Sequence, residues 1–218
     1  NYLKQLKKSK KKFEKIVVND GSKDNTLKII SKFKKKIKII NNKKNIGFAK
    51  SLKRAIKNTN YSNFLWIGAD NPDRSFVNIF KEFKLLDLKY KNKFILVQYY
   101  DYKNKKRRSF LRRVFSNYYT NLVNFVFFKS IPYYNGQSVY NKNFFNVNKL
   151  CNSRFILAQI LLVSLNYNPK LFFIRYNISN SDIDETSSSL LYLVTTTIKD
   201  LFIYRFLTIK DKINLLKQ

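Results

Sequence analysis

The fold of this chain is decided by the stretch Ile16-Val17-Val18-Asn19-Asp20-Gly21-Ser22-Lys23-Asp24-Asn25-Thr26. Three β-branched apolar residues run into a polar turn. Leu27, Ile29, Ile30 and Phe33 then follow at helical spacing. This pattern predicts a strand, a tight turn and a helix.

The turn itself has a clear local chemistry. Gly21 supplies a backbone position without a Cβ, and Asp24, Asn25 or Thr26 can cap the helix that follows. Asp20 then lies at the carboxyl end of a strand, where open α/β sheets bind ligands. An ordinary, well-capped strand-to-helix turn would look the same when the stretch is taken alone.

The rest of the chain repeats this rhythm. The expected strands are 13–19, 37–40, 64–67 and 94–98, and the expected helices between them are 24–36, 48–58 and 75–87. Strands that alternate with helices of this length predict one α/β domain with a mostly parallel central sheet flanked by helices. Beyond residue 100 we expect amphipathic or apolar helices at 109–128, 154–166 and 189–207, with a strand at 170–176.

The amino-acid composition limits which partners and which kinds of catalytic or metal site the chain can have. Lys and Arg number 44 against 13 acids, a net charge of +31, which favours anionic partners, although the Lys- and Asn-rich bias of an A/T-rich genome would also produce it. His is absent and Cys151 is the single Cys, which excludes His-dependent catalysis, His or multi-Cys metal sites and an intrachain disulfide. No apolar run reaches the roughly 18 residues of a membrane-spanning helix. No Met occurs, even at position 1, so we expect the true start to be missing.

Two acids follow expected strands directly. Asp20 ends the first strand, and Asp70 comes shortly after the strand at 64–67. In a parallel sheet both would lie on the same edge. Two carboxylates there, in so basic a chain, suit a nucleotide held partly through Mg²⁺ or Mn²⁺.

These residues carry a family resemblance. Val17 to Thr26 resembles the nucleotide-binding turn of family 2 glycosyltransferases of the GT-A type, especially the polyprenyl-phosphate, dolichol-phosphate mannose synthase-like branch. Asn45-x-Gly47-x-Ala49 resembles the second signature of the family, and Gly68-Ala69-Asp70 stands in the place of its metal-binding Asp-x-Asp. The three motifs also agree in order and spacing. The resemblance implies a single GT-A-like, Rossmann-like domain, with the first strand of the family missing at the N-terminus.

The resemblance also implies an activity: transfer of a sugar from a nucleotide-sugar to an acceptor, a polyprenyl-phosphate lipid, with help from Mg²⁺ or Mn²⁺. Residues 1–100 would form the donor half and 101–218 the acceptor half. The implied donor-binding residues are Asp20, Gly21, Ser22, Asp24, Asn45, Gly47 and Asp70. Asp70 would be catalytic and would hold the metal with Asp73. The implied acceptor and phosphate-binding residues are Arg107, Arg108, Arg112, Arg113, Ser116 and Gln137.

Two departures bear on the acceptor. Gly68 replaces the usual first Asp of the metal motif, and Gln159 falls where a helix-borne acid often lies. A sugar hydroxyl needs a carboxylate base, whereas a phosphate acceptor is already an anionic nucleophile, so the lipid phosphate is favoured. Alternatives are a hydroxyl acceptor in cell-surface glycan synthesis, an inactive copy, or a non-catalytic basic module that binds acidic membrane or nucleic acid.

The basic and aromatic stretch 107–128 has three interpretations. It could be a core-facing helix with a solvated basic face, an interfacial helix on anionic lipid, or a binder of single-stranded nucleic acid. The resemblance favours lipid over nucleic acid. It predicts a cytoplasmic protein, peripheral on the inner face of the membrane.

Overall fold

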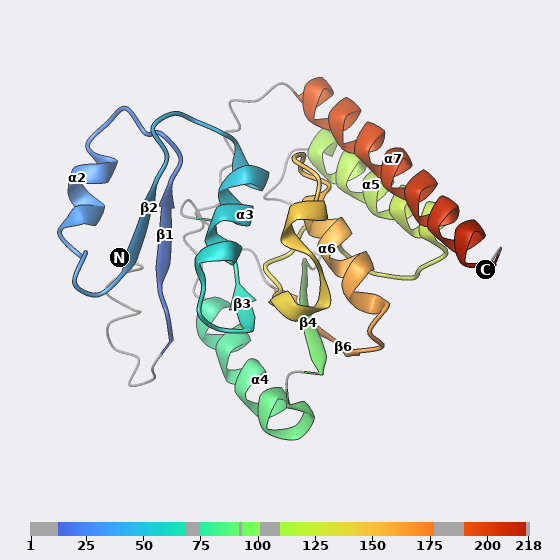
Figure 1. The fold of residues 1–218 in the computed structure, drawn as a ribbon, viewed down its shortest axis with the longest axis horizontal. Helices are drawn as coiled ribbons and strands as arrows, with labels where there is room; N and C mark the ends of the chain where they lie inside the picture. The colour runs from blue at the N-terminus through green and yellow to red at the C-terminus, as the bar shows by residue number, and fades with distance from the viewer. Residues whose placement is uncertain (1–12, 69–74, 92, 101–109, 177–189, 217–218) are drawn as a thin grey trace.

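A computed structural model describes residues 13–68, 75–91, 93–100, 110–176 and 190–216. The strands are β1 (Ile16–Asn19), β2 (Lys38–Asn41), β3 (Asn63–Leu65), β4 (Phe94–Tyr100), β5 (Val139–Asn141) and β6 (Lys170–Tyr176). The α-helices are α2 (Thr26–Ser31), α3 (Phe48–Asn58), α4 (Ser75–Tyr90), α5 (Phe110–Phe127), α6 (Ile156–Leu165) and α7 (Leu190–Leu216), with short 3₁₀ turns η1 (Lys142–Phe144) and η2 (Val147–Lys149). Figure 1 shows β1, β2 and α2 at one end of the molecule and the α5–α7 pair at the other.

The strands form two hydrogen-bonded sheets within the described ranges. β1 and β2 pair in parallel, with Ile16 opposite Lys38 and Asn19 opposite Asn41. The second sheet has the order β3-β5-β4-β6, in which β4 and β6 are parallel. In the same described ranges, β1 pairs with β2 alone. That the first strand of the family is missing from the N-terminus stays a prediction.

The α/β class is confirmed, but the sheet is less parallel than expected. β5 runs antiparallel to both β3 and β4. It is entered through Gly136, which lies against the backbone of Gln98 so closely that a Cβ would collide with the Gln98 carbonyl. The chain therefore reaches β5 beside the carboxyl-terminal half of β4 and runs back along it. The three-residue β5 is too short to leave a periodic signal in the sequence.

Most expected elements are confirmed, with shifted ends. The helix at 48–58 and the strand at 170–176 agree with the structure, and α7 extends nine residues beyond the expected end at 207. The first helix was expected at 24–36 but ends at Ser31. Lys28, Lys32 and Lys36 are spaced four residues apart, so a longer helix would place like charges side by side.

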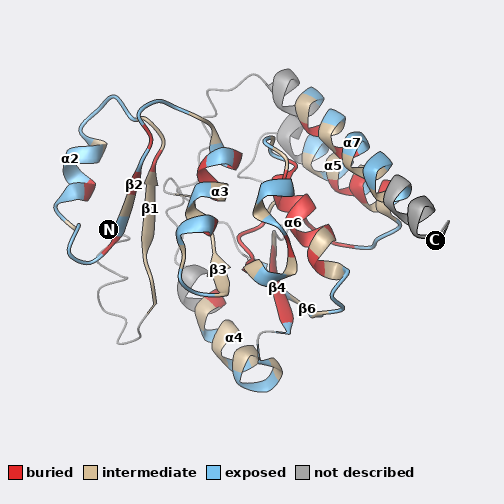
Figure 2. Cartoon of the chain, in the orientation of Figure 1, coloured by how far each residue is buried: buried red, intermediate tan, exposed pale blue. Residues whose placement is uncertain are grey.

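The core surrounds β4 and α6. Alternate side chains of β4 point to opposite faces: Ile95 and Val97 join the main cluster with α6, whereas Phe94 and Leu96 pack with Ile79 of α4. Figure 2 shows α6 as the most continuously buried helix. None of the described helices is long and apolar enough to cross a membrane.

Candidate functional site

Asp20 is held in a cradle of donors just beyond β1. Its Oδ1 accepts hydrogen bonds from the Ile46 backbone N–H at 3.0 Å and from Asn42 Nδ2 at 2.9 Å, and its Oδ2 accepts one from the Gly47 N–H at 3.0 Å. Partial burial alone would raise the pKa of this carboxyl. The hydrogen bonds from Ile46, Asn42, Ser51 and Gly47 outweigh it and hold the pKa below its usual value. Asp20 is therefore a fixed anion at neutral pH.

Gly21 brings the turn against the second loop. Its φ is +74°, and a Cβ there would collide with the backbone of Lys44 and Asn45. Both the conformation and the close approach require glycine at this position. The structure thus brings together four of the predicted donor-binding residues: Asp20, Gly21, Asn45 and Gly47.

Gly47 begins α3 and joins the two loops. Its φ of +86° suits glycine, and its N–H points both to Asp20 Oδ2 and to Asn45 Oδ1, each at 3.0 Å. Its carbonyl accepts the first hydrogen bond of the helix, from the N–H of Ser51. The start of α3 is thus oriented by the carboxylate that ends β1.

Asn42 is a site residue that sequence reasoning missed. It is 2% exposed, and its Nδ2 donates to Asp20 Oδ1 and to Ser51 Oγ, both at 2.9 Å, while its Oδ1 accepts from the Arg54 guanidinium. Its own N–H bonds to the Asn19 carbonyl at 2.9 Å. The same argument that singled out Asp20 would have found it, because Asn42 follows the neighbouring parallel strand.

Ser22 and Asp24 serve the turn locally. The Ser22 N–H donates to Asn19 Oδ1 at 3.3 Å, and the Thr26 N–H donates to Asp24 Oδ1 at 3.0 Å. Hydrogen bonds from the Thr26 side chain and backbone lower the pKa of Asp24. Asp24 is therefore the residue that caps α2, while Asn25 makes no side-chain cap.

Asp70, Asp73, Arg107 and Arg108 lie outside the described residues. The described part of the chain breaks off after Gly68 and resumes at Ser75. Trp66 contacts Phe48 edge-on with a ring-centroid distance of 5.2 Å, so the segment leading to Asp70 starts beside the first residue of α3. β1 and β3 belong to separate sheets in the described ranges, so the single parallel edge expected to carry both Asp20 and Asp70 is not observed there.

The remaining predicted residues lie on the second half of the chain. Arg112, Arg113 and Ser116 belong to α5, and Gln137 is buried two residues before β5. Their roles stay predictions.

Gln159 binds the loop before α6. Its Oε1 accepts from the Cys151 N–H at 2.7 Å, and its Nε2 donates to the Lys149 carbonyl at 3.4 Å. A carboxylate could accept the first bond but could not donate the second. An amide at this position therefore has a structural explanation.

Comparison with known proteins identifies the family to which this chain belongs. The family model described as Glycosyl transferase family 2 matches residues 1–146. The uncharacterized protein MJ0544 of Methanocaldococcus jannaschii is 48% identical over 62 residues, which cover 26% of this chain and 27% of that protein. The chain thus matches about a quarter of the length of this relative.

Two solved structures share the fold. Glucosyl-3-phosphoglycerate synthase from Mycobacterium tuberculosis, in complex with Mn²⁺, uridine diphosphate and glucosyl-3-phosphoglycerate, matches with a TM-score of 0.62 and 14% identity, over 88% of this chain and 68% of that one. TarS 1–349 of S. aureus matches with a TM-score of 0.51 and 17% identity, over 79% and 52%. At these identities the likeness establishes the fold alone.

Proposed function

Since this chain belongs to Glycosyl transferase family 2, we propose that it transfers a sugar from a nucleotide-sugar donor to an acceptor. The observation that carries the proposal is the fixed carboxylate of Asp20, locked to the loop that opens α3. A preorganised anion of this kind, at the carboxyl end of a strand, suits the hydroxyl and N–H groups of a nucleoside.

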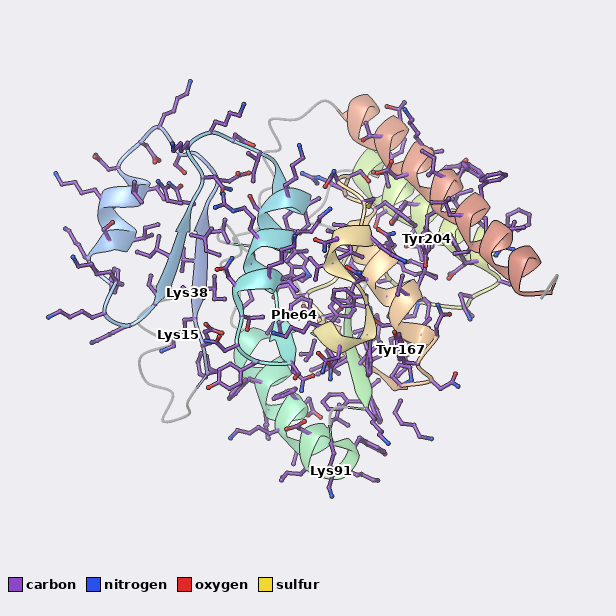
Figure 3. All side chains as sticks on the ribbon, in the orientation of Figure 1. Lys15, Lys38, Phe64, Lys91, Tyr167 and Tyr204 are labelled. Carbon is purple, nitrogen blue, oxygen red and sulfur yellow. The ribbon has the colours of Figure 1, made fainter. Side chains whose placement is uncertain are left out.

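The rim of the cradle suits a diphosphate. Lys23, Lys43 and Lys44 are exposed on the two loops that meet at Gly21, so these loops carry positive charge close in sequence to the partly buried Asp20. We place the nucleoside against Asp20 and the phosphates toward these lysines. Figure 3 shows the side chains of this end reaching outward from the ribbon.

Asp70 and Asp73 would hold the divalent metal. Their carboxylates are hard oxygen donors in a chain without His, which fits Mg²⁺ or Mn²⁺. Trp66, four residues before Asp70 in the sequence, contacts Phe48, the first residue of α3. When bound, such a metal stabilises the negative charge of the departing nucleoside diphosphate.

For the acceptor we propose a polyprenyl phosphate. A phosphate oxygen forms the new bond to the anomeric carbon while the bond from that carbon to the nucleoside diphosphate breaks, and the electron pair leaves with the diphosphate. An amide and not a carboxylate stands at Gln159, which agrees with this choice, because an acceptor that is already anionic needs no general base. The Arg107, Arg108, Arg112 and Arg113 group, with Ser116 and Gln137, would bind the acceptor phosphate.

Nucleotide titration tests the proposal. We expect the protein to bind uridine or guanosine diphosphate in the presence of Mn²⁺, and Asp20→Ala to weaken that binding by roughly tenfold or more, the loss of a charge-assisted contact. Glu82→Ala is the control, since it removes a carboxylate from α4, which contributes no predicted donor-binding residue. Equal affinities for the wild type and Asp20→Ala would contradict the donor site.

One alternative rests on the charge of +31, which a basic module without catalysis would also explain. Such a module would bind nucleic acid with a steep dependence on salt and would bind no nucleotide with Mn²⁺. That combination of results would favour a non-catalytic basic module over a glycosyltransferase.

A further inference from the structure

A polar groove lies between α5 and the loop that leads from this helix to β5. Its volume is about 380 Å³, within the range of about 300–1,000 Å³ that is usual for small-molecule sites. We call it the α5 groove; its walls are Asn117, Thr120, Asn121 and Asn124 of α5 and residues 130–132 of the loop. Because α5 lies at the end of the molecule opposite β1 and β2 (Figure 1), the α5 groove is separate from the Asp20 cradle.

The helix wall of the groove is polar and uncharged. Asn117, Thr120, Asn121 and Asn124 follow the spacing i, i+3, i+4, i+7, so they lie on one face of α5. Asn and Thr are weaker helix formers than Ala, Leu, Glu or Lys, so helix stability does not explain why they share this face. Among the described residues that line the groove none is charged, although the chain contains 44 Lys and Arg. The wall therefore suits a neutral, polar ligand.

Asn124 fixes the shape of the groove. Its Nδ2 donates to the Ile131 carbonyl at 2.9 Å, and its Oδ1 accepts from the Ile131 N–H at 3.0 Å and from the Tyr134 hydroxyl at 2.8 Å. At the end of the helix, the Lys129 N–H donates to the Asn124 carbonyl at 3.0 Å. The helix and the loop are therefore joined without a ligand, and a preformed site costs less to bind than one that must first be ordered.

Thr120 carries a buried hydroxyl that lacks a partner. The residue is 7% exposed, and within the described part of the chain its Oγ1 makes no hydrogen bond. A Thr inside a helix can bond back to the carbonyl three or four residues before it, and this one does not. An unpaired buried hydroxyl is unfavourable, and a ligand in the groove that Thr120 lines can supply the missing bond.

The chemistry of the lining indicates the class of ligand. Asn117, Asn121 and Ser130 are exposed, and their amide and hydroxyl groups both donate and accept hydrogen bonds, as sugar hydroxyls do. Ile131 and Pro132 add aliphatic surface, against which the C–H groups of a sugar ring can pack. Among the described lining residues there is no aromatic ring on which a nucleobase could stack and no cation for a phosphate. A neutral saccharide fits this lining, whereas a nucleotide does not.

We propose that the α5 groove binds a neutral saccharide. Hydroxyls of the sugar bond to the side-chain amides of Asn117 and Asn121 and to the Thr120 hydroxyl, while one side of the ring packs against Pro132. This saccharide is held away from the Asp20 cradle, so it is not the sugar of the bound donor. The proposal does not rest on the transfer reaction: failure of nucleotide binding would leave it intact, and failure of saccharide binding would leave the donor site intact.

Saturation-transfer NMR on the full chain tests the proposal. The probes are the methyl glycosides of glucose, galactose, mannose and N-acetylglucosamine, each added up to roughly 50 mM, a range that covers millimolar affinities. We expect at least one of these glycosides to bind. If none of them binds, the proposal is wrong.

A double variant assigns the binding to the groove. Asn117→Ala/Asn121→Ala should weaken the affinity for the glycoside by about tenfold or more. The same variant should unfold at the wild-type temperature or above it, because Ala favours the helix. The matched control Asn143→Ala/Asn166→Ala removes two exposed amides that do not line the groove and should bind like the wild type. Equal affinities for the wild type and Asn117→Ala/Asn121→Ala would overturn the proposal.

Thr120→Val separates saccharide binding from stability. Valine has a similar shape and removes the unpaired hydroxyl, so the variant should be at least as stable as the wild type and yet bind the glycoside several-fold more weakly. A purely structural Thr120 would show no such opposition. Uridine diphosphate with Mg²⁺ should not displace the glycoside from the wild type. Undiminished affinity of Thr120→Val, or displacement by the nucleotide, would overturn the assignment of the saccharide to the α5 groove.

Discussion

Asp20 shows how much a single residue can carry when its donors are fixed. Its pKa is lowered in the folded protein, so its hydrogen bonds add stability above the unfolded pKa of about 3.9, and this stability is lost as the pH falls through the lower folded value. Asp20→Asn should therefore be less stable than the wild type at pH 7, with the difference shrinking below about pH 4. Thermal unfolding between pH 7 and pH 3 measures this, and a difference independent of pH would contradict it.

Asn42 is the second residue on which the site depends. Asn42→Ala would leave the buried Ser51 hydroxyl without this partner and would remove the acceptor of the exposed Arg54 guanidinium, a loss of about 1–3 kcal/mol in the free energy of unfolding. Asn58→Ala is the control, because Asn58 is exposed and its side chain donates to the Arg54 carbonyl, while its own carbonyl, which accepts from Lys38 Nζ, is retained in the variant. Urea unfolding of both variants checks the difference; equal midpoints would exclude the network.

At the scale of elements, β5 depends on a glycine before it. Gly136→Ala would drive a Cβ into the Gln98 carbonyl and separate β5 from β4, so we expect a loss of several kcal/mol. Ser130→Ala, in the same loop and exposed, should change little. A fully stable Gly136→Ala protein, measured by chemical unfolding, would mean that the approach of the two backbones is not needed.

The elements also show where sequence reasoning stops. The turn at 16–26 and helix α3 were predictable because local periodicity and turn chemistry specify them. The antiparallel course of β5 was not, since it depends on a close approach between Gly136 and Gln98, far apart in the sequence. Likewise Asp20, Gly21, Asn45 and Gly47 were found as motifs. Asn42 was missed although its position after a strand was available from the sequence; what the sequence did not indicate is its burial and its bonds to Asp20, Ser51 and Arg54.

For the whole molecule, the dominant feature is the charge of +31. Self-repulsion destabilises the compact state, and salt screens it over a Debye length of about 10 Å at 0.1 M. We therefore expect the melting temperature to rise as sodium chloride increases from roughly 0.01 M to 0.3 M. Calorimetry across this range checks the prediction, and a melting temperature that falls with salt would show that attractive pairs dominate.

At the scale of the whole molecule, the Asp20 cradle lies at the end that holds β1 and β2, and the α5–α7 pair lies at the opposite end, as Figure 1 shows. Substitutions in the cradle and in the α5–α7 pair can therefore be tested separately.

The location of the nucleotide tests the central claim most directly. Amide NMR spectra of the isotope-labelled protein would be recorded with uridine or guanosine diphosphate and Mg²⁺, and then with traces of paramagnetic Mn²⁺. We predict that the signals of Gly21, Ile46 and Gly47 shift on addition of nucleotide and broaden with Mn²⁺ only when nucleotide is present. Signals at these three residues that stay unchanged while nucleotide binds elsewhere would contradict the donor site.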